Sequence, residues 1–142
     1  MADILLSKKE KMRVYIGFDD TDILNSDFGT GKVARRYERL LPEGCKVWGV
    51  VRQQLLLDPA IPYTSHNSSA CVVVNRPDPS YVETLKNTAI THIEAMSVSG
   101  SDPGLCLVVE GDSALPTLES FGLLCTAKIV SQTDAIRAAG CA

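Results

Sequence analysis

The pattern of apolar residues along the chain predicts four strands. Short runs rich in β-branched and other apolar residues lie at 13–18, 45–51, 70–75 and 105–110, and such runs are typical of strands. The third and fourth runs do not alternate between apolar and polar residues, so we expect both to be buried on both faces of a sheet. Trp48, inside the second run, is expected in the core.

Between and after these runs the apolar spacing changes to that of helices. One helix is predicted from Gly31 and ends at the sequence LPEG, with its arginines largely on the face opposite the apolar one. A second helix begins near Pro79 and keeps an apolar stripe through Met96. The segments 114–126 and 132–140 are also expected to be helical.

The resulting order, β-α-β-β-α-β-α, predicts an α/β fold of the α+β sandwich type. A ferredoxin-like split β-α-β is the most economical topology for this order. Each β-α-β unit is expected to make parallel strands joined by a right-handed crossover. Residues 1–12 are expected to form a frayed N-terminus, and residues 13–142 a single α/β domain.

Size and charge narrow the classes of function. A chain of 142 residues suits one core, and a net charge of −3 does not suggest a broad nucleic-acid surface, although a local basic patch stays open. The five cysteines include no closely spaced pair, which argues against a zinc site.

No long apolar run or signal peptide is visible, so we expect a cytoplasmic protein with no membrane partner. An open sheet edge would permit a homodimer.

Three carboxylates follow the first predicted strand directly. Asp19, Asp20 and Asp22 lie within four positions, and at the end of a strand the turning chain lets all three converge. Such a group is hard to ionise without a cation, and oxygen-only ligands suit Mg²⁺. The alternative is a solvated loop that caps the next helix. The position at the end of a buried strand favours ligand binding.

A Gly-Thr-Gly-Lys turn at 29–32 opens the first predicted helix. It is not a P-loop, because Ser26 stands where that motif needs a glycine and Val33 where it needs Ser or Thr. Backbone N–H groups at a helix start can still bind an anion, although such a turn is also common without a ligand. Beside the carboxylates it predicts a phosphate-bearing ligand bridged by the cation. The residues assigned to phosphate binding are Thr21, Gly29, Thr30, Gly31 and Lys32.

A second group of polar residues lies between the second and third predicted strands. His66 is a candidate general acid or base, and Arg52 a candidate for stabilising transferred charge. Tyr63, Asn67 and Ser68 are candidate ligand-binding residues. The alternative is that His66 and Asn67 satisfy backbone groups of the loop. His92, the other histidine, lies within a predicted helix and is interpreted as structural.

Three segments, in order, carry a resemblance to a known family. They are YIGFDDTD with its glycine turn, DPAIPYTSHNSSA and DPGLCLVV. Together they resemble the N-terminal kinase-like and ferredoxin-like region of the archaeal isoleucine-tRNA 2-agmatinylcytidine synthetase. The chain also resembles short bacterial proteins with GTGKxAR and IPYTSHNSSA. The synthetase uses ATP and Mg²⁺ to activate a cytidine of the tRNA anticodon, which agmatine then attacks.

The resemblance implies roles for particular residues. It implies that Asp19, Asp20 and Asp22 handle Mg²⁺ and ATP phosphates, and that the region around Tyr63 lies near the substrate. Lys32 aligns with a threonine that the synthetase uses in phosphoryl chemistry. The OB-fold and zinc ribbon with which the synthetase grips tRNA do not fit into 142 residues. We therefore expect tRNA as a partner only with additional domains or partner proteins.

Two functions remain open on the sequence. The first is an enzyme of Mg²⁺- and nucleotide-dependent phosphoryl or adenylyl transfer, with Asp20, Asp22, His66 and Arg52 as catalytic residues and with Mg²⁺ and ATP as cofactors. The second is a non-catalytic module that binds a nucleotide or another phosphorylated small molecule in the same pocket. Consumption of ATP distinguishes them.

Overall fold

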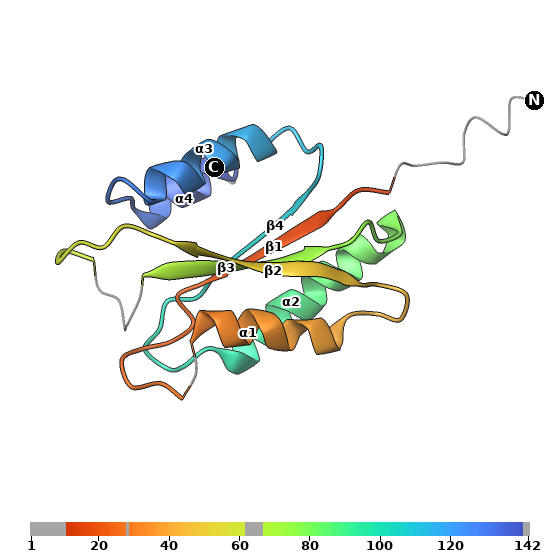
Figure 1. Ribbon diagram of the computed structural model, residues 1–142, viewed down its shortest axis with the longest axis horizontal. Coiled ribbons are helices and arrows are strands. Elements are labelled where there is room, and N and C mark those ends of the chain that lie inside the picture. The colour runs from red at the N-terminus through yellow and green to blue at the C-terminus, as the bar shows by residue number, and fades with distance from the viewer. Residues whose placement is uncertain (1–10, 28, 62–66, 141–142) are drawn as a thin grey trace, which may run out of the picture.

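The chain folds as a sheet with helices on both sides, as the computed structural model shows for residues 11–27, 29–61 and 67–140 (Figure 1). The sheet has four strands in the order β2-β3-β1-β4, and every neighbouring pair is antiparallel. The strands are β1 (Val14–Asp19), β2 (Val47–Gln54), β3 (Ser68–Val74) and β4 (Gly104–Val109). The helices are α1 (Thr30–Tyr37), α2 (Val82–Met96), α3 (Leu115–Cys125) and α4 (Gln132–Ala138).

This strand order confirms the predicted ferredoxin-like split β-α-β. Both β1 and β2 pair antiparallel with β3, so they run parallel to each other with β3 between them. Likewise, β3 and β4 both pair antiparallel with β1, so they run parallel to each other with β1 between them. The start of β4 therefore lies beside the end of β1, and this adjacency builds the site described below.

The main core lies between the sheet and the layer formed by α1 and α2. Alternate residues of β1 point into it, and Ile16 and Phe18 are completely buried. Tyr37 of α1 is also completely buried, and its hydroxyl donates to the carbonyl oxygen of Leu85 at 2.7 Å, which joins α1 to α2. The Nε2–H of His92 donates to the carbonyl of Val33 at 2.8 Å. His92 is thus structural, as predicted.

The opposite face of the sheet is covered by α3 and α4 (Figure 1). No residue of either helix is buried. Hydrogen bonds between described residues connect this pair of helices to the rest of the chain: the Leu56 N–H donates to the Cys125 carbonyl at 3.1 Å, and the Gln132 amide donates to the Asp102 carboxylate. Both bonds lie at the end of the molecule that carries the candidate site.

Two expectations about burial are wrong. Trp48 is 56% exposed instead of lying in the core, because β2 is an edge strand and the indole lies on the surface under the guanidinium of Arg13. The fourth strand is the other edge, and Cys106 in it is exposed, so β4 is not buried on both faces. An apolar run does not distinguish an edge strand from a central one.

Two further expectations concern the termini and the membrane. Of the predicted frayed segment 1–12, only Lys11 and Met12 lie within the described residues, so that prediction and the single-domain boundary stay predictions. Among the residues that the structure describes, no helix is both long and apolar enough to cross a bilayer.

Candidate functional site

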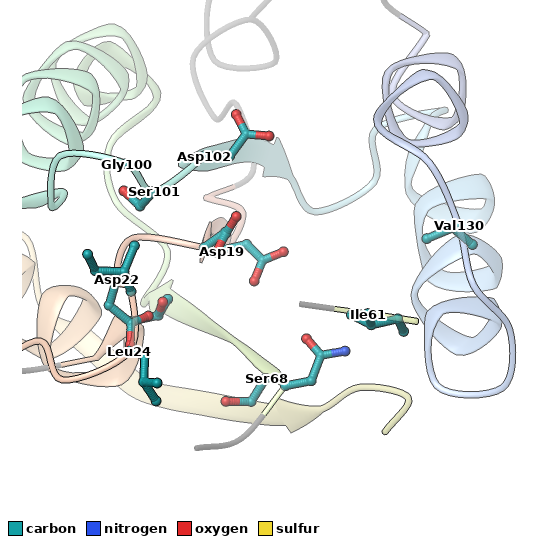
Figure 2. A pocket seen from close by; sticks show the side chains of 13 residues that line it. Asp19, Asp22, Leu24, Ile61, Ser68, Gly100, Ser101, Asp102 and Val130 are labelled. Carbon is teal, nitrogen blue, oxygen red and sulfur yellow. The ribbon is translucent and has the colours of Figure 1, made fainter. Parts of the chain in front are cut away.

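A pocket of about 670 Å³ opens where four loops meet, those after β1, before β3, before β4 and between α3 and α4 (Figure 2). Four carboxylates contribute to its lining, together with aliphatic and small polar residues. The described residues that line it are Asp19, Asp20, Asp22, Ile23, Leu24, Thr30, Ile61, Asn67, Ser68, Gly100, Ser101, Asp102 and Val130.

The carboxylates are positioned by the end of β1. Asp19 is the last residue of β1 and pairs with Gly104 at the start of β4. Asp20 then adopts a φ of +47°, a left-handed conformation that aspartate tolerates better than most residues. This conformation turns the chain sharply out of the sheet, so Asp19, Asp20 and Asp22 all reach the pocket.

A pair of threonines fixes the loop after β1. Thr21 is fully buried, and its hydroxyl lies 3.0 Å from that of Thr30, the first residue of α1. The carbonyl of Thr21 accepts a hydrogen bond from the Val98 N–H at 2.9 Å. Thr21 therefore joins the carboxylate loop both to α1 and to the loop before β4. It was predicted to bind phosphate, but it does not line the pocket, and its hydroxyl is bonded within the protein.

Burial and mutual repulsion disfavour the ionised carboxylates. Burial raises the pKa of Asp19 to about 6, the N–H of Asp20 partly offsets this, and the charges of Asp20 and Asp22 add to it. The pKa of Asp20 is also raised, first by burial and then by the charge of Asp102, whose backbone N–H donates to the Asp20 carboxylate and partly compensates. A cation in the pocket would relieve both effects.

The carboxylates of the pocket could supply some, but not all, of the ligands of a Mg²⁺ ion. Among the described residues, no group of three or more His, Cys, Asp or Glu side chains is arranged to hold a metal ion. Asp19, Asp20 and Asp22 therefore line one pocket without forming a complete set of ligands. Mg²⁺ is usually held by one or two carboxylates, with waters and substrate phosphates completing the octahedron. The carboxylates present fit that mode of binding.

The glycine turn is only partly directed at the pocket. Thr30 lines the pocket, whereas Lys32 is exposed and does not. Asp22 lies against the start of α1, with its Oδ2 3.6 Å from the position that a Cβ on Gly29 would take. A carboxylate of the protein thus already faces the helix start that was predicted to bind phosphate. Gly31 faces the guanidinium of Arg35, 3.5 Å from the equivalent Cβ position.

The described part of the polar group before β3 lies at the same pocket. Ser68 and Asn67 line it, and the Arg52 Nε–H donates to the Ser68 hydroxyl at 3.0 Å, which places Arg52 at the pocket margin. The side-chain amide of Asn67 donates to the Leu56 carbonyl at 2.7 Å, so it also supports its own loop. The candidates Tyr63 and His66 lie outside the described residues.

Several pocket residues were missed by the sequence analysis, and Asp102 is the most important. It belongs to the loop before β4 and begins the segment DPGLCLVV, but no role was assigned to it. The antiparallel pairing of Asp19 with Gly104 brings this loop against the carboxylates. The signal was available in the predicted topology, because a ferredoxin-like order places the start of β4 beside the end of β1. Ile61 begins the IPY segment that the resemblance implied to lie near the substrate, whereas Val130 carried no such signal.

Comparisons with known proteins identify the fold. No protein-family model and no curated protein matches the chain. The solved complex of TiaS with an isoleucine tRNA, AMPCPP and agmatine matches with a TM-score of 0.69 and 23% identity. Apo TiaS, a tRNA agmatidine synthetase, matches with a TM-score of 0.65 and 22% identity, and a tRNA fluorescent labeling enzyme with 0.68 and 24%.

These matches cover 91% of this chain but 30% of each matched chain. At such identities the likeness shows a shared fold, which is also the one expected from the resemblance to the agmatinylcytidine synthetase. The resemblance to short bacterial proteins stays a prediction.

Proposed function

We propose that this chain binds a Mg²⁺–nucleotide complex in the pocket at the end of β1 and uses it for phosphoryl or adenylyl transfer. The observation that carries the proposal is the group of carboxylates from two loops, with the pKa values of Asp19 and Asp20 raised by burial and by neighbouring negative charge. A protein gains no stability from such an arrangement alone. Strongly perturbed carboxylates in a cleft are characteristic of functional sites.

The chain's own residues would act in the following way. Asp19, Asp20 and Asp22 would supply the one or two carboxylate ligands of the cation, and Asp102 adds negative charge and an N–H donor that orients Asp20. Mg²⁺, when bound, would offset the negative charge of the ligand's phosphate groups. Arg52 lies beside Ser68 at the pocket margin, and its guanidinium would add positive charge near the ligand. Positioning and charge stabilisation are the main contributions that proteins make to phosphoryl transfer.

The solved relatives support the nucleotide part of this proposal. The TiaS complex contains AMPCPP, an ATP analogue, together with tRNA and agmatine. A pocket of about 670 Å³ is within the usual range for small-molecule sites. An RNA acceptor remains an expectation that depends on additional domains or partners, since this chain spans 30% of the TiaS chain.

Calorimetric titration with the non-hydrolysable analogue AMPPNP, with and without millimolar Mg²⁺, tests the binding step. We expect binding that depends on Mg²⁺ and that falls at least about tenfold in Asp20→Asn, because a cation ligand is lost. Glu94→Gln, which removes an exposed carboxylate on α2, is the matched control and should bind normally. Equal binding with and without Mg²⁺, or an unaffected Asp20→Asn, would contradict the proposal.

One observation favours the non-catalytic alternative. Lys32 stands where the synthetase has its threonine, and its side chain is exposed and outside the pocket lining. The residue expected to replace a catalytic group is therefore not directed at the ligand. If the chain binds Mg²⁺–ATP but consumes none in the presence of candidate acceptors, the binding module is the better description.

A further inference from the structure

The pocket has two chemically different sides. Asp19 and Asp22 contribute to its acidic side, whereas Ile61 and Val130 both lie on the side away from Asp22 and Leu24 (Figure 2). Ile61 comes from the loop between β2 and β3, and Val130 from the loop between α3 and α4. We propose that Ile61 and Val130 form a subsite for the nucleobase, so that the nucleotide lies with its phosphates toward the carboxylates and its base under the α3–α4 loop.

The backbone beside Ile61 and the backbone beside Val130 are each hydrogen-bonded before any ligand arrives. The N–H of Ile61 donates to the Asp58 carbonyl at 2.9 Å, which closes a tight turn. Val130 directly precedes Ser131, which caps α4 through a reciprocal pair of bonds with Asp134. Preorganised apolar side chains bind a flat ring at a low cost in conformational entropy.

The two loops are also joined to each other. The Leu56 N–H, in the same loop as Ile61, donates to the Cys125 carbonyl at the end of α3. Asn67 supports this link by donating to the Leu56 carbonyl. The segments that carry Ile61 and Val130 are therefore connected through a hydrogen bond between their elements before any ligand binds.

The other aliphatic residues of the pocket are less suited to this role. Ile23 and Leu24 are 41% and 67% exposed and belong to one loop, so they offer one wall instead of two. Ile61 and Val130 are both half-buried and come from loops that are far apart in the sequence. Aliphatic walls with a few polar groups nearby, here Asn67, are the common composition of small-molecule sites.

This proposal deepens the proposed function and rests on it, so the experiment separates the two. Binding of Mg²⁺–tripolyphosphate and of Mg²⁺–AMPPNP is measured by calorimetry, because tripolyphosphate carries the phosphates without a base. We expect the nucleotide to bind at least about tenfold more tightly, since it alone gains the apolar contacts. Ile61→Ser and Val130→Ser should weaken AMPPNP binding by about tenfold and leave tripolyphosphate binding unchanged.

Matched controls are available on the same two loops. Leu57→Ser and Ile129→Ser alter aliphatic residues that are 55% and 56% exposed and that do not line the pocket, so both should bind both ligands normally. Equal affinities for the two ligands, or equal losses for both in Val130→Ser, would overturn the base subsite and leave the Mg²⁺–phosphate site standing. Absence of Mg²⁺-dependent binding of either ligand would overturn both proposals.

Discussion

Asp19 is expected to destabilise the folded protein at neutral pH, and this is measurable. Its pKa is about 6 in the folded chain against 3.8 for an ordinary aspartate. The folded state therefore holds the Asp19 proton more tightly than the unfolded chain does. As pH rises through the interval between these two values, the free energy of unfolding falls, and above about pH 7 the loss is complete.

The size of the effect follows from the same two pKa values. Each unit of difference in pKa corresponds to about 1.4 kcal/mol, so the ionised Asp19 lowers the free energy of unfolding by about 3 kcal/mol. Because water screens this half-buried carboxylate, the loss is closer to about 2 kcal/mol. Asn is nearly isosteric with Asp and keeps an oxygen that can accept the Asp20 N–H. Asp19→Asn should therefore raise the free energy of unfolding by about 2 to 3 kcal/mol near pH 8, and the melting temperature by about 10 °C.

The pH dependence makes this prediction specific. Near pH 4 Asp19 is protonated in the folded wild type, so the advantage of Asp19→Asn should shrink below about 1 kcal/mol. The free energy of unfolding is measured in urea near pH 4 and near pH 8 for the wild type, for Asp19→Asn and for the control Glu94→Gln. A gain of equal size at both pH values would point to packing, and no gain near pH 8 would refute the account of the Asp19 carboxylate.

Three other substitutions test how the site is supported, each by urea unfolding. Tyr37→Phe leaves the Leu85 carbonyl without its 2.7 Å donor and should cost about 1 to 3 kcal/mol; an unchanged midpoint would argue against this bond. Thr30→Val removes the hydroxyl that contacts Thr21 and should lower the free energy of unfolding by about 1 to 2 kcal/mol. The control Lys32→Met, at an exposed position, should lower it less. Trp48→Ala should cost less than about 1 kcal/mol, because the indole is exposed; a core residue would cost several times more.

The sequence predicted the fold well because the apolar periodicity is local and strong. Alternate burial along β1 and the buried face of α1 follow directly from it. Edge positions are set by the pairing of distant strands, which no local pattern contains. That is why Trp48 was assigned to the core and why β4 was expected to be buried on both faces.

The candidate site was predictable only in part, for the same reason. Asp19, Asp20 and Asp22 are adjacent in the sequence, so their cluster is visible there. Asp102 joins them only because β4 pairs with β1, and Val130 only because α3 and α4 return across the sheet. Contacts within a loop can be inferred from its residues, whereas contacts between loops require the topology.

Substitution of the glycines in the turn at 29–32 can show whether they serve the fold or ligand binding. Gly29 and Gly31 have no positive φ, and a Cβ at either would make ordinary contacts, 3.6 Å from the Asp22 Oδ2 and 3.5 Å from the Arg35 guanidinium. The fold therefore does not require glycine at either position. Because Gly31 lies within α1, Gly31→Ala should stabilise the protein by about 0.5 to 1 kcal/mol in urea unfolding.

If phosphate oxygens approach this backbone, the same methyl group would obstruct them, and Mg²⁺–AMPPNP binding would weaken while stability rose. Stability and affinity moving in opposite directions would place the phosphates at the start of α1. A more stable Gly31→Ala with unchanged affinity would leave phosphate binding to the cation at the carboxylates, without a contribution from the start of α1.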